Sequence, residues 1–211
     1  MKPSEFLTNI VDFFAVLLPG AIITFVIYQT ISPESIFSSK IVLTETQSWI
    51  AFVLAAYILG SFIFFVGSLL DGKFYNWMRK KPYNWIRYKI LDKEKDNFTY
   101  EYAEEYKKEM LKRNNKSVSN IKWAKANVYL FHPSAAPELH RFEANSKFFR
   151  SLSVVFFLLI FIGMIKNLWL LALICLLGFI FSLFCYTDQR YKYTELACIY
   201  LIAIYQKTNK G

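Results

Sequence analysis

The chain has 211 residues, of which 55% are hydrophobic, 19% are aromatic and 19% are charged, and its formal net charge at pH 7 is +9. The apolar residues are gathered in four blocks that contain no charged side chain, whereas helices of soluble domains rarely run about 20 residues without a polar face. This distribution argues against a soluble helical core and predicts an all-α integral membrane protein with four transmembrane helices. The three cysteines fit neither a disulfide framework nor a metal-ligand spacing.

The first block belongs to residues 1–31, which we interpret as the N-terminus and a kinked first span. Glu5 and Asp12 stand where a cleaved signal peptide would have a basic leader, so we expect the block to stay in the protein. Pro19 cannot bond the carbonyl oxygen four residues earlier, and its ring crowds that turn. We therefore expect a helix that is broken near mid-membrane, with Pro19 and Gly20 as its hinge. A turn between strands is excluded because an open sheet edge cannot face lipid.

The second block, residues 49–70, follows a short outer loop at residues 32–48. The block meets the length of roughly 17 to 25 residues that a hydrocarbon layer of about 30 Å requires of a helix. Ala56, Gly60 and Gly67 share one face of this helix. Small residues placed in this way let two helices approach closely in lipid. The pattern fits packing within one chain and packing between subunits of a homo-oligomer equally well.

The middle segment, residues 71–150, holds 18 Lys and Arg residues against 10 Asp and Glu residues. Because loops rich in Lys and Arg stay on the cytoplasmic side, we predict a basic cytoplasmic helical domain between the second and third spans. Both termini then lie in the cytoplasm, and the two short loops face outward from the bacterial inner membrane. The topology accounts for most of the positive charge, so the charge does not favour nucleic acid as a partner.

A repeated pattern opens this segment, with "YNWMRKK" at residues 75–81 followed by "YNWIRYK" at residues 83–89. Each copy places a tryptophan two positions before an arginine. The four residues that we expect at the membrane interface are Trp77, Arg79, Trp85 and Arg87. Tryptophan at headgroup depth and arginine on anionic lipid suit this place, which makes membrane lipid the expected partner. The same pairs would also suit stacking on an unpaired base with a phosphate contact, which we favour less.

Strong helix formers predict two cytoplasmic helices, at residues 100–114 and at residues 120–131. The stretch "HPSAAP" then separates two predicted helices, and Ser134 is placed to cap the second of them. From Glu138 the sequence has neither Gly nor Pro until Gly163, so one long helix is expected to begin in the cytoplasm and continue into the third span. At 1.5 Å per residue this helix exceeds the thickness of the hydrocarbon layer.

The cytoplasmic part of that helix carries His140, Arg141 and Glu143. We expect these residues to belong to a stalk that packs against other helices. Arg141 and Glu143 are two positions apart and do not face each other, so their ion pairs should join them to other helices.

Residues 151–186 contain the third and fourth apolar blocks, separated by only Lys166 and Asn167. This spacing predicts a tight helical hairpin. Residues 187–211 are interpreted as a separate cytoplasmic C-terminal helix, centred on residues 194–207. Once the charges around it are counted, this helix is too short to span, and it should pack on the cytoplasmic helices or lie in the interface.

The residue patterns of common catalytic sites are missing. The two histidines, His132 and His140, lack an H-E-x-x-H spacing, and no nucleophile elbow, Walker loop or dinucleotide glycine fingerprint is present. The Arg-to-His spacing used by one kind of RNase is also absent. Carriers keep ionisable residues within their spans, and here such residues lie only at the ends. We therefore expect no enzyme, no metal and no cofactor. A pore formed by several subunits is less constrained and could be lined by Thr24, Gln29, Ser61 and Ser68.

Three stretches carry a resemblance to a known group of proteins: "LLPG" in the first span, "ILGSFIFFVGSLLDG" in the second and "LHRFEANSKFFRSL" entering the third. The chain resembles small multi-span bacterial membrane proteins of anti-phage loci, in particular the accessory membrane proteins of type VI-B CRISPR systems. The resemblance implies a protein that assembles in the inner membrane and perturbs it, or signals, when infection is sensed. It carries over no catalytic residues.

Two functions from different classes follow from these observations. The first is a non-enzymatic, oligomeric inner-membrane protein that forms a pore or disturbs the bilayer in anti-phage defence. The alternative is a membrane-tethered adaptor or sensor without a pore, which docks a soluble effector encoded nearby through its cytoplasmic helices. An enzyme acting on lipid or RNA has the least support.

Overall fold

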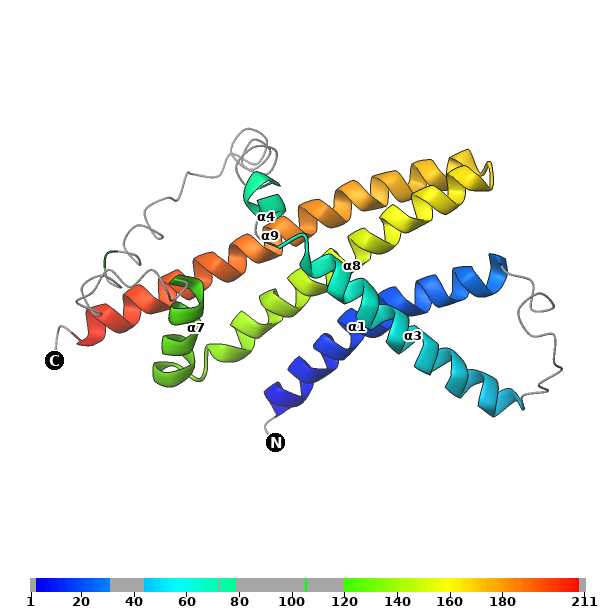
Figure 1. Ribbon diagram of the computed structural model, residues 1–211. Helices are drawn as coiled ribbons and strands as arrows, with labels where there is room; N and C mark the ends of the chain where they lie inside the picture. The colour runs from blue at the N-terminus through cyan, green and yellow to red at the C-terminus, as the bar shows by residue number, and fades with distance from the viewer. Residues whose placement is uncertain (1–2, 31–43, 72, 79–104, 106–119, 209–211) are drawn as a thin grey trace.

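The computed structural model describes residues 3–30, 44–71, 73–78, 105 and 120–208 (Figure 1). The helices that it contains are α1 (Pro3–Thr30), α3 (Glu45–Ser68), α4 (Lys73–Met78), α7 (Asn120–Phe131), α8 (Ala136–Ile165) and α9 (Trp169–Thr208). All regular structure in the described part of the chain is helical, which confirms the predicted all-α class.

Helix α1 continues without interruption through Pro19, so the expected break in this helix is not seen. The ring of Pro19 is buried, and the hydroxyl of Thr24 donates a hydrogen bond to the carbonyl oxygen of Gly20 at 2.8 Å. A helix in lipid can tolerate proline when neighbouring helices and Ser or Thr side chains compensate for the lost bond. Motion about Pro19 and Gly20 stays a prediction.

Helices α1 and α3 cross each other (Figure 1), and their glycines lie in the contact. A methyl group built on Gly20 would lie 1.8 Å from the backbone oxygen of Ala56 and 2.6 Å from the backbone nitrogen of Gly60. One built on Gly60 would lie 2.1 Å from the backbone oxygen of Val16. The two backbones are therefore in direct contact, and in the described structure Ala56 and Gly60 pack within one chain. This is one of the two alternatives that the sequence leaves open.

Helix α3 begins with a capping box. The backbone nitrogen of Thr44 donates to the Gln47 side chain at 3.0 Å, and the backbone nitrogen of Gln47 donates to the Thr44 hydroxyl at 3.4 Å. These bonds satisfy amide groups that have no partner inside the helix, which explains why the helix starts before the apolar block.

The helix predicted at residues 120–131 and the long helix predicted from Glu138 onward are both present, as α7 and α8. The predicted cap of α8 is wrong, because Ala135 occupies that position and makes no side-chain capping bond. Pro137 lies in the first turn instead, where its missing amide hydrogen costs nothing. Helix α8 is 30 residues long and carries both the charged residues after Pro137 and the uncharged stretch of the third apolar block.

The predicted hairpin is present, since α8 ends at Ile165 and α9 begins at Trp169. Asn167 turns the chain with a positive φ of 55°, and the amide of Leu168 donates to the carbonyl oxygen of Gly163 at 2.8 Å. No separate C-terminal helix follows the fourth apolar block, because α9 runs unbroken for 40 residues to Thr208. The sequence of α9 has no Gly or Pro after Gly178, so nothing stops the helix at the end of the fourth apolar block.

Three helices in the described part of the chain, α3, α8 and α9, are long and apolar enough to cross a membrane. The apolar part of α1, Phe13–Gln29, is shorter. Many large apolar side chains of these helices point outward, among them Phe62, Ile165 and Leu170. A surface of this kind is stable against lipid and unfavourable in water, which supports a membrane-embedded protein.

Two small cores hold the helices together. One joins α1, α3 and α8 through Ile23, Ile63 and Val155. The other joins α7, α8 and α9 through residues that include Ala124, Leu139 and Ala197. In Figure 1 the C-terminal end of α1, the N-terminal end of α3 and the turn between α8 and α9 all lie toward the right. The N-terminal end of α1, the C-terminal end of α9 and α7 lie to the left of them.

Candidate functional site

A polar cluster that we call the boundary triad joins three segments at the edge of the apolar blocks. Its members are Asp71 in the turn after α3, Arg150 on α8 and Tyr186 on α9. The Tyr186 hydroxyl donates to Oδ1 of Asp71 at 2.5 Å, and Nη1 of Arg150 donates to Oδ2. One carboxylate therefore connects α8 and α9 to the end of α3.

The two donors of the triad are buried, whereas the acceptor is not. The Arg150 side chain is 6% exposed and the Asp71 side chain is 35% exposed, and Tyr186 is fully buried. The guanidinium carbon lies 4.8 Å from the centre of the Phe64 ring. A methyl group built on Gly67 would lie 3.4 Å from Nε of Arg150, an ordinary van der Waals distance, so the Arg150 side chain packs over this glycine. A buried charge of this kind is stable only while its partners stay in place.

Further contacts extend the triad along α4 and α8. The rings of Tyr75 on α4 and Tyr186 meet edge to face, with centres 6.0 Å apart. The Ser153 hydroxyl donates to the carbonyl oxygen of Arg150 at 2.7 Å. Ser151 and Ser182 are fully buried nearby in sequence, and their hydroxyls have no hydrogen-bond partner among the described residues. Small side chains such as these let two helices approach closely in lipid.

A second charged cluster fastens α7 to α8. Nζ of Lys125 on α7 lies 2.5 Å from Oε2 of Glu143, and Nζ of Lys147 lies 3.4 Å from Oε1. Burial acts to raise the pKa of Glu143, but the hydrogen bonds and charges of the two lysines outweigh it and hold that pKa below its usual value of 4.5. Glu143 therefore pairs with another helix, as its spacing from Arg141 predicts.

This cluster should make the protein sensitive to acid. Because the pKa of Glu143 is depressed in the folded state, its stabilising effect is complete above about pH 4.5 and is lost as the pH falls through the folded pKa. We expect the thermal unfolding midpoint of the wild type, followed by circular dichroism in detergent, to fall more steeply below pH 4.5 than that of Glu143→Gln. Parallel profiles for the two proteins would contradict this expectation.

The residues that the sequence predicts as sites are distributed over several places. Pro19, Gly20, Ala56 and Gly60 lie at the crossing of α1 and α3, whereas Gly67 lies under Arg150. The structure therefore divides the small-residue face of α3 between two contacts.

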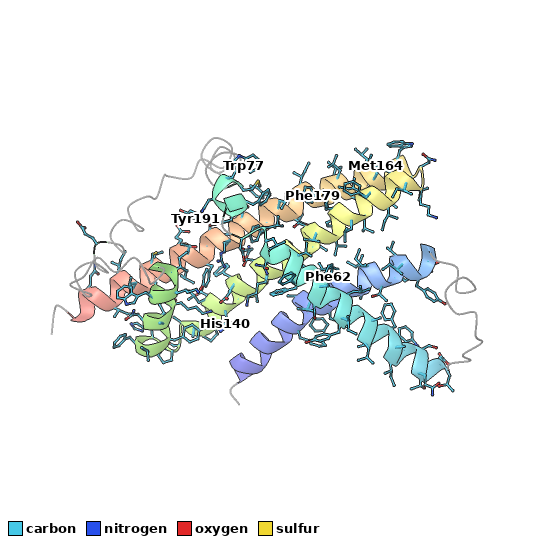
Figure 2. The ribbon with its side chains drawn as sticks, viewed as in Figure 1. Phe62, Trp77, His140, Met164, Phe179 and Tyr191 are labelled. Atoms are coloured by element: carbon cyan, nitrogen blue, oxygen red, sulfur yellow. The ribbon has the colours of Figure 1, made fainter. Side chains whose placement is uncertain are left out.

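The predicted stalk residues do not converge on one point. His140 packs its ring edge to face on Tyr129, with centres 5.6 Å apart, on the part of α8 labelled in Figure 2. Arg141 is exposed and lies over the ring of Phe142 at 5.1 Å, whereas Glu143 is turned toward α7. Three side chains that diverge in this way do not form a catalytic constellation.

Of the predicted interface residues, Trp77 is exposed on α4 (Figure 2). Arg79, Trp85 and Arg87 lie outside the described residues, as do most of the outer loop and most of the predicted helix at residues 100–114. Within the described ranges, no group of three or more His, Cys, Asp or Glu side chains is placed to hold a metal ion.

Sequence reasoning missed the boundary triad. Its three residues are far apart in the chain, but each one lies at or next to the end of an apolar block that is predicted to face the cytoplasm. Under the predicted topology these three ends are at the same depth, a signal that could have placed the three residues near one another without showing which side chains pair. Comparisons with protein-family models, with curated proteins and with solved structures found no match.

Proposed function

We propose that the protein is a non-enzymatic, oligomeric inner-membrane protein with four spans, which disturbs the bilayer in anti-phage defence when its cytoplasmic helices receive a signal. The observation that carries this proposal is the continuity of α8 and α9. Both helices pass without a break from the α7-packed end into the apolar hairpin. A partner that moves the cytoplasmic ends would therefore move the membrane segments directly, because a continuous helix transmits displacement along its axis.

The arrangement of helix ends supports four spans. The C-terminal end of α1, the N-terminal end of α3 and the α8–α9 turn lie on one side, and the N-terminal end of α1 and the C-terminal end of α9 lie on the other (Figure 1). Helix α1 has 28 residues, which at 1.5 Å per residue corresponds to about 42 Å and is enough to cross a bilayer. The basic segment after α3 favours a cytoplasmic location for both termini, because loops rich in Lys and Arg stay on the cytoplasmic side.

An oligomer must use surfaces other than the small-residue face of α3, since that face packs within the chain. The exposed apolar sides of α3 and α9 are the surfaces available in the described structure. The hydroxyls of Thr24, Ser61 and Ser68 all donate to carbonyl oxygens of their own helices. Bonds of this kind satisfy hydroxyls on lipid-facing helices, so these residues need not line a pore. Disturbance of the bilayer by the whole assembly therefore has more support than a pore lined by these hydroxyls.

The defence context rests on the resemblance of the three stretches named above. These stretches include Gly20 and Gly60 of the crossing and Asp71 and Arg150 of the boundary triad. The resemblance thus coincides with the places where the helices are joined, which favours a shared membrane arrangement over a chance similarity of apolar residues.

Dye release from vesicles tests the proposed activity. The purified protein is reconstituted into calcein-filled vesicles of phosphatidylethanolamine and phosphatidylglycerol, with and without the soluble protein encoded by the neighbouring gene. We expect release that rises more than linearly with protein density, because assembly is required, and a slower release from Pro19→Ala if α1 bends during the process. Vesicles that stay sealed at every density and with the neighbouring protein would refute membrane disturbance.

The adaptor function is the second candidate, and the end of α7 favours it. Leu130 and Phe131 are 75% and 61% exposed there, although they lie at the end of the molecule that carries the charged helices. Large apolar side chains exposed to water are typical of docking surfaces. Sealed vesicles that nevertheless bind the neighbouring soluble protein, with binding lost in Leu130→Asp, would support the adaptor in place of the first function.

A further inference from the structure

The three members of the boundary triad are held with very different firmness. Arg150 and Tyr186 project from long uninterrupted helices, and both are buried. Asp71 is in the short turn after α3, where its amide donates to the carbonyl oxygen of Ser68 at 3.1 Å. Its side chain is 35% exposed, so water reaches the carboxylate and competes for its hydrogen bonds. Asp71 is therefore the member of the triad whose side chain can separate from the other two.

Helix α3 is suited to rock once Asp71 leaves. Its middle touches α1 through the backbones of Gly20, Ala56 and Gly60, where the two helices come closest. Side chains flank this contact, and the rings of Phe13 on α1 and Tyr57 on α3 stack with their centres 6.2 Å apart. Beyond this crossing, α3 meets α8 through Ile63 and through Gly67 beneath Arg150. Contacts between apolar helices in lipid are van der Waals contacts with little additional driving force. The charged bond at the end of α3 is thus the strongest single interaction that opposes rotation about the crossing.

Helix α3 can move away from α8 because Arg150 lies where it can find other partners for its charge. It is the last charged residue before the uncharged part of α8, at the boundary of the apolar block. A guanidinium at such a boundary can turn toward the headgroups and pair with phosphate or water when its carboxylate is gone. The released state therefore exchanges one charged hydrogen bond for another and does not leave a bare charge in hydrocarbon.

We infer that the Asp71 carboxylate is a releasable latch, which holds the cytoplasmic end of α3 against α8 and α9 and, when it opens, lets α3 rock on its glycine crossing with α1. The latch concerns the resting arrangement of the helices. It holds whether or not the protein permeabilises membranes, and its test does not use permeabilisation.

Distances between the outer ends of α3 and α9 test the latch. Spin labels are placed at Ile50→Cys and Leu170→Cys, whose side chains are 56% and 73% exposed, in a chain with its three native cysteines replaced by alanine. Labelled protein is diluted with unlabelled protein in lipid nanodiscs so that only distances within one chain are measured. We expect one narrow distance population with Asp71 intact. In Asp71→Asn we expect a second distance population. Its fraction should be at least about tenfold larger than in the protein with Asp71 intact, because losing the partner of a buried charge costs several kcal/mol.

Asp188→Asn is the matched control, because it removes the same charge from a pair with Lys192 on α9 that does not involve α3. It should keep the narrow population. Tyr186→Phe removes only one of the two bonds to Asp71 and should give a smaller second population, which keeps the test decisive if Asp71→Asn fails to fold. A narrow, unshifted distribution in the folded Asp71 variant, or in Tyr186→Phe where that variant alone folds, would overturn the latch.

Discussion

Replacing Gly20 with alanine is expected to force α1 away from α3 and to lower the free energy of unfolding by at least about 3 kcal/mol, the upper end of the usual cost of overpacking. The added methyl group would lie 1.8 Å from the backbone oxygen of Ala56 and 2.6 Å from the backbone nitrogen of Gly60. Backbone atoms of a helix cannot rotate aside as a side chain can, so the whole helix must move. Unfolding of the purified protein in mixed micelles by increasing dodecyl sulfate, followed by circular dichroism, measures this loss.

Gly178→Ala is the control for this experiment. A methyl group there would lie 2.8 Å from the edge of the Phe156 ring, which is a side chain and can turn away. Its cost should be no more than about 1 kcal/mol, because a small shift of one ring relieves the contact. If the two variants lost equal stability, the crossing would not be the tight contact that the geometry indicates.

Replacing Asp71 with alanine is expected to cost about 3 kcal/mol, the lower end for a buried ion pair because the Asp71 side chain is 35% exposed. The variant leaves the buried guanidinium of Arg150 without its carboxylate. The reverse variant, Arg150→Met, should cost less, since the carboxylate that it leaves behind is partly solvated and methionine fills the space beside Phe64. The same unfolding titration should therefore show a larger loss of stability for Asp71→Ala than for Arg150→Met.

The double variant Asp71→Ala with Arg150→Met should recover most of the loss of Asp71→Ala, because no unpaired charge remains. Asp188→Ala supplies the reference for a solvated pair, as Lys192 and Asp188 are 41% and 25% exposed, and its cost should stay within about 0.5 kcal/mol. Additive losses in the double variant would mean that Asp71 and Arg150 act independently.

The sequence predicts the helices well where their signals are local. Runs of apolar residues, the strong helix formers after Asn120 and the short separation at Lys166 and Asn167 correspond to α3, α7, α8 and the hairpin turn. These features depend only on residues close to one another in the chain. The prediction that a helix ends after the fourth apolar block was wrong, because α9 continues to Thr208. A change from apolar to charged residues is typical of a membrane surface but does not by itself stop a helix.

The boundary triad could not be assigned from the sequence alone, for a rotational reason. Successive residues of an α-helix point about 100° apart, so the choice between Lys147 and Arg150 as the partner of Asp71 depends on how α8 is turned. That turn is set by packing, including the contact of Gly67 with Arg150 and the core around Val155. The small residues of α3 show the same limitation, since their spacing fits a neighbour in the same chain and a neighbour in another subunit equally well.

Because α9 is unbroken, the number of residues between its first and second halves cannot change without disturbing their packing. One side of its first half faces α8 within the apolar hairpin, where Gly178 meets Phe156, and one side of its second half forms a core with α7 and α8, where Ala197 and Leu201 are buried. One residue added between these halves would rotate them by about 100° relative to each other, and one of the two buried faces would turn outward. The segment around Tyr186 therefore tolerates exchange of side chains far more readily than insertion or deletion, although the sequence predicts a boundary between two separate helices there.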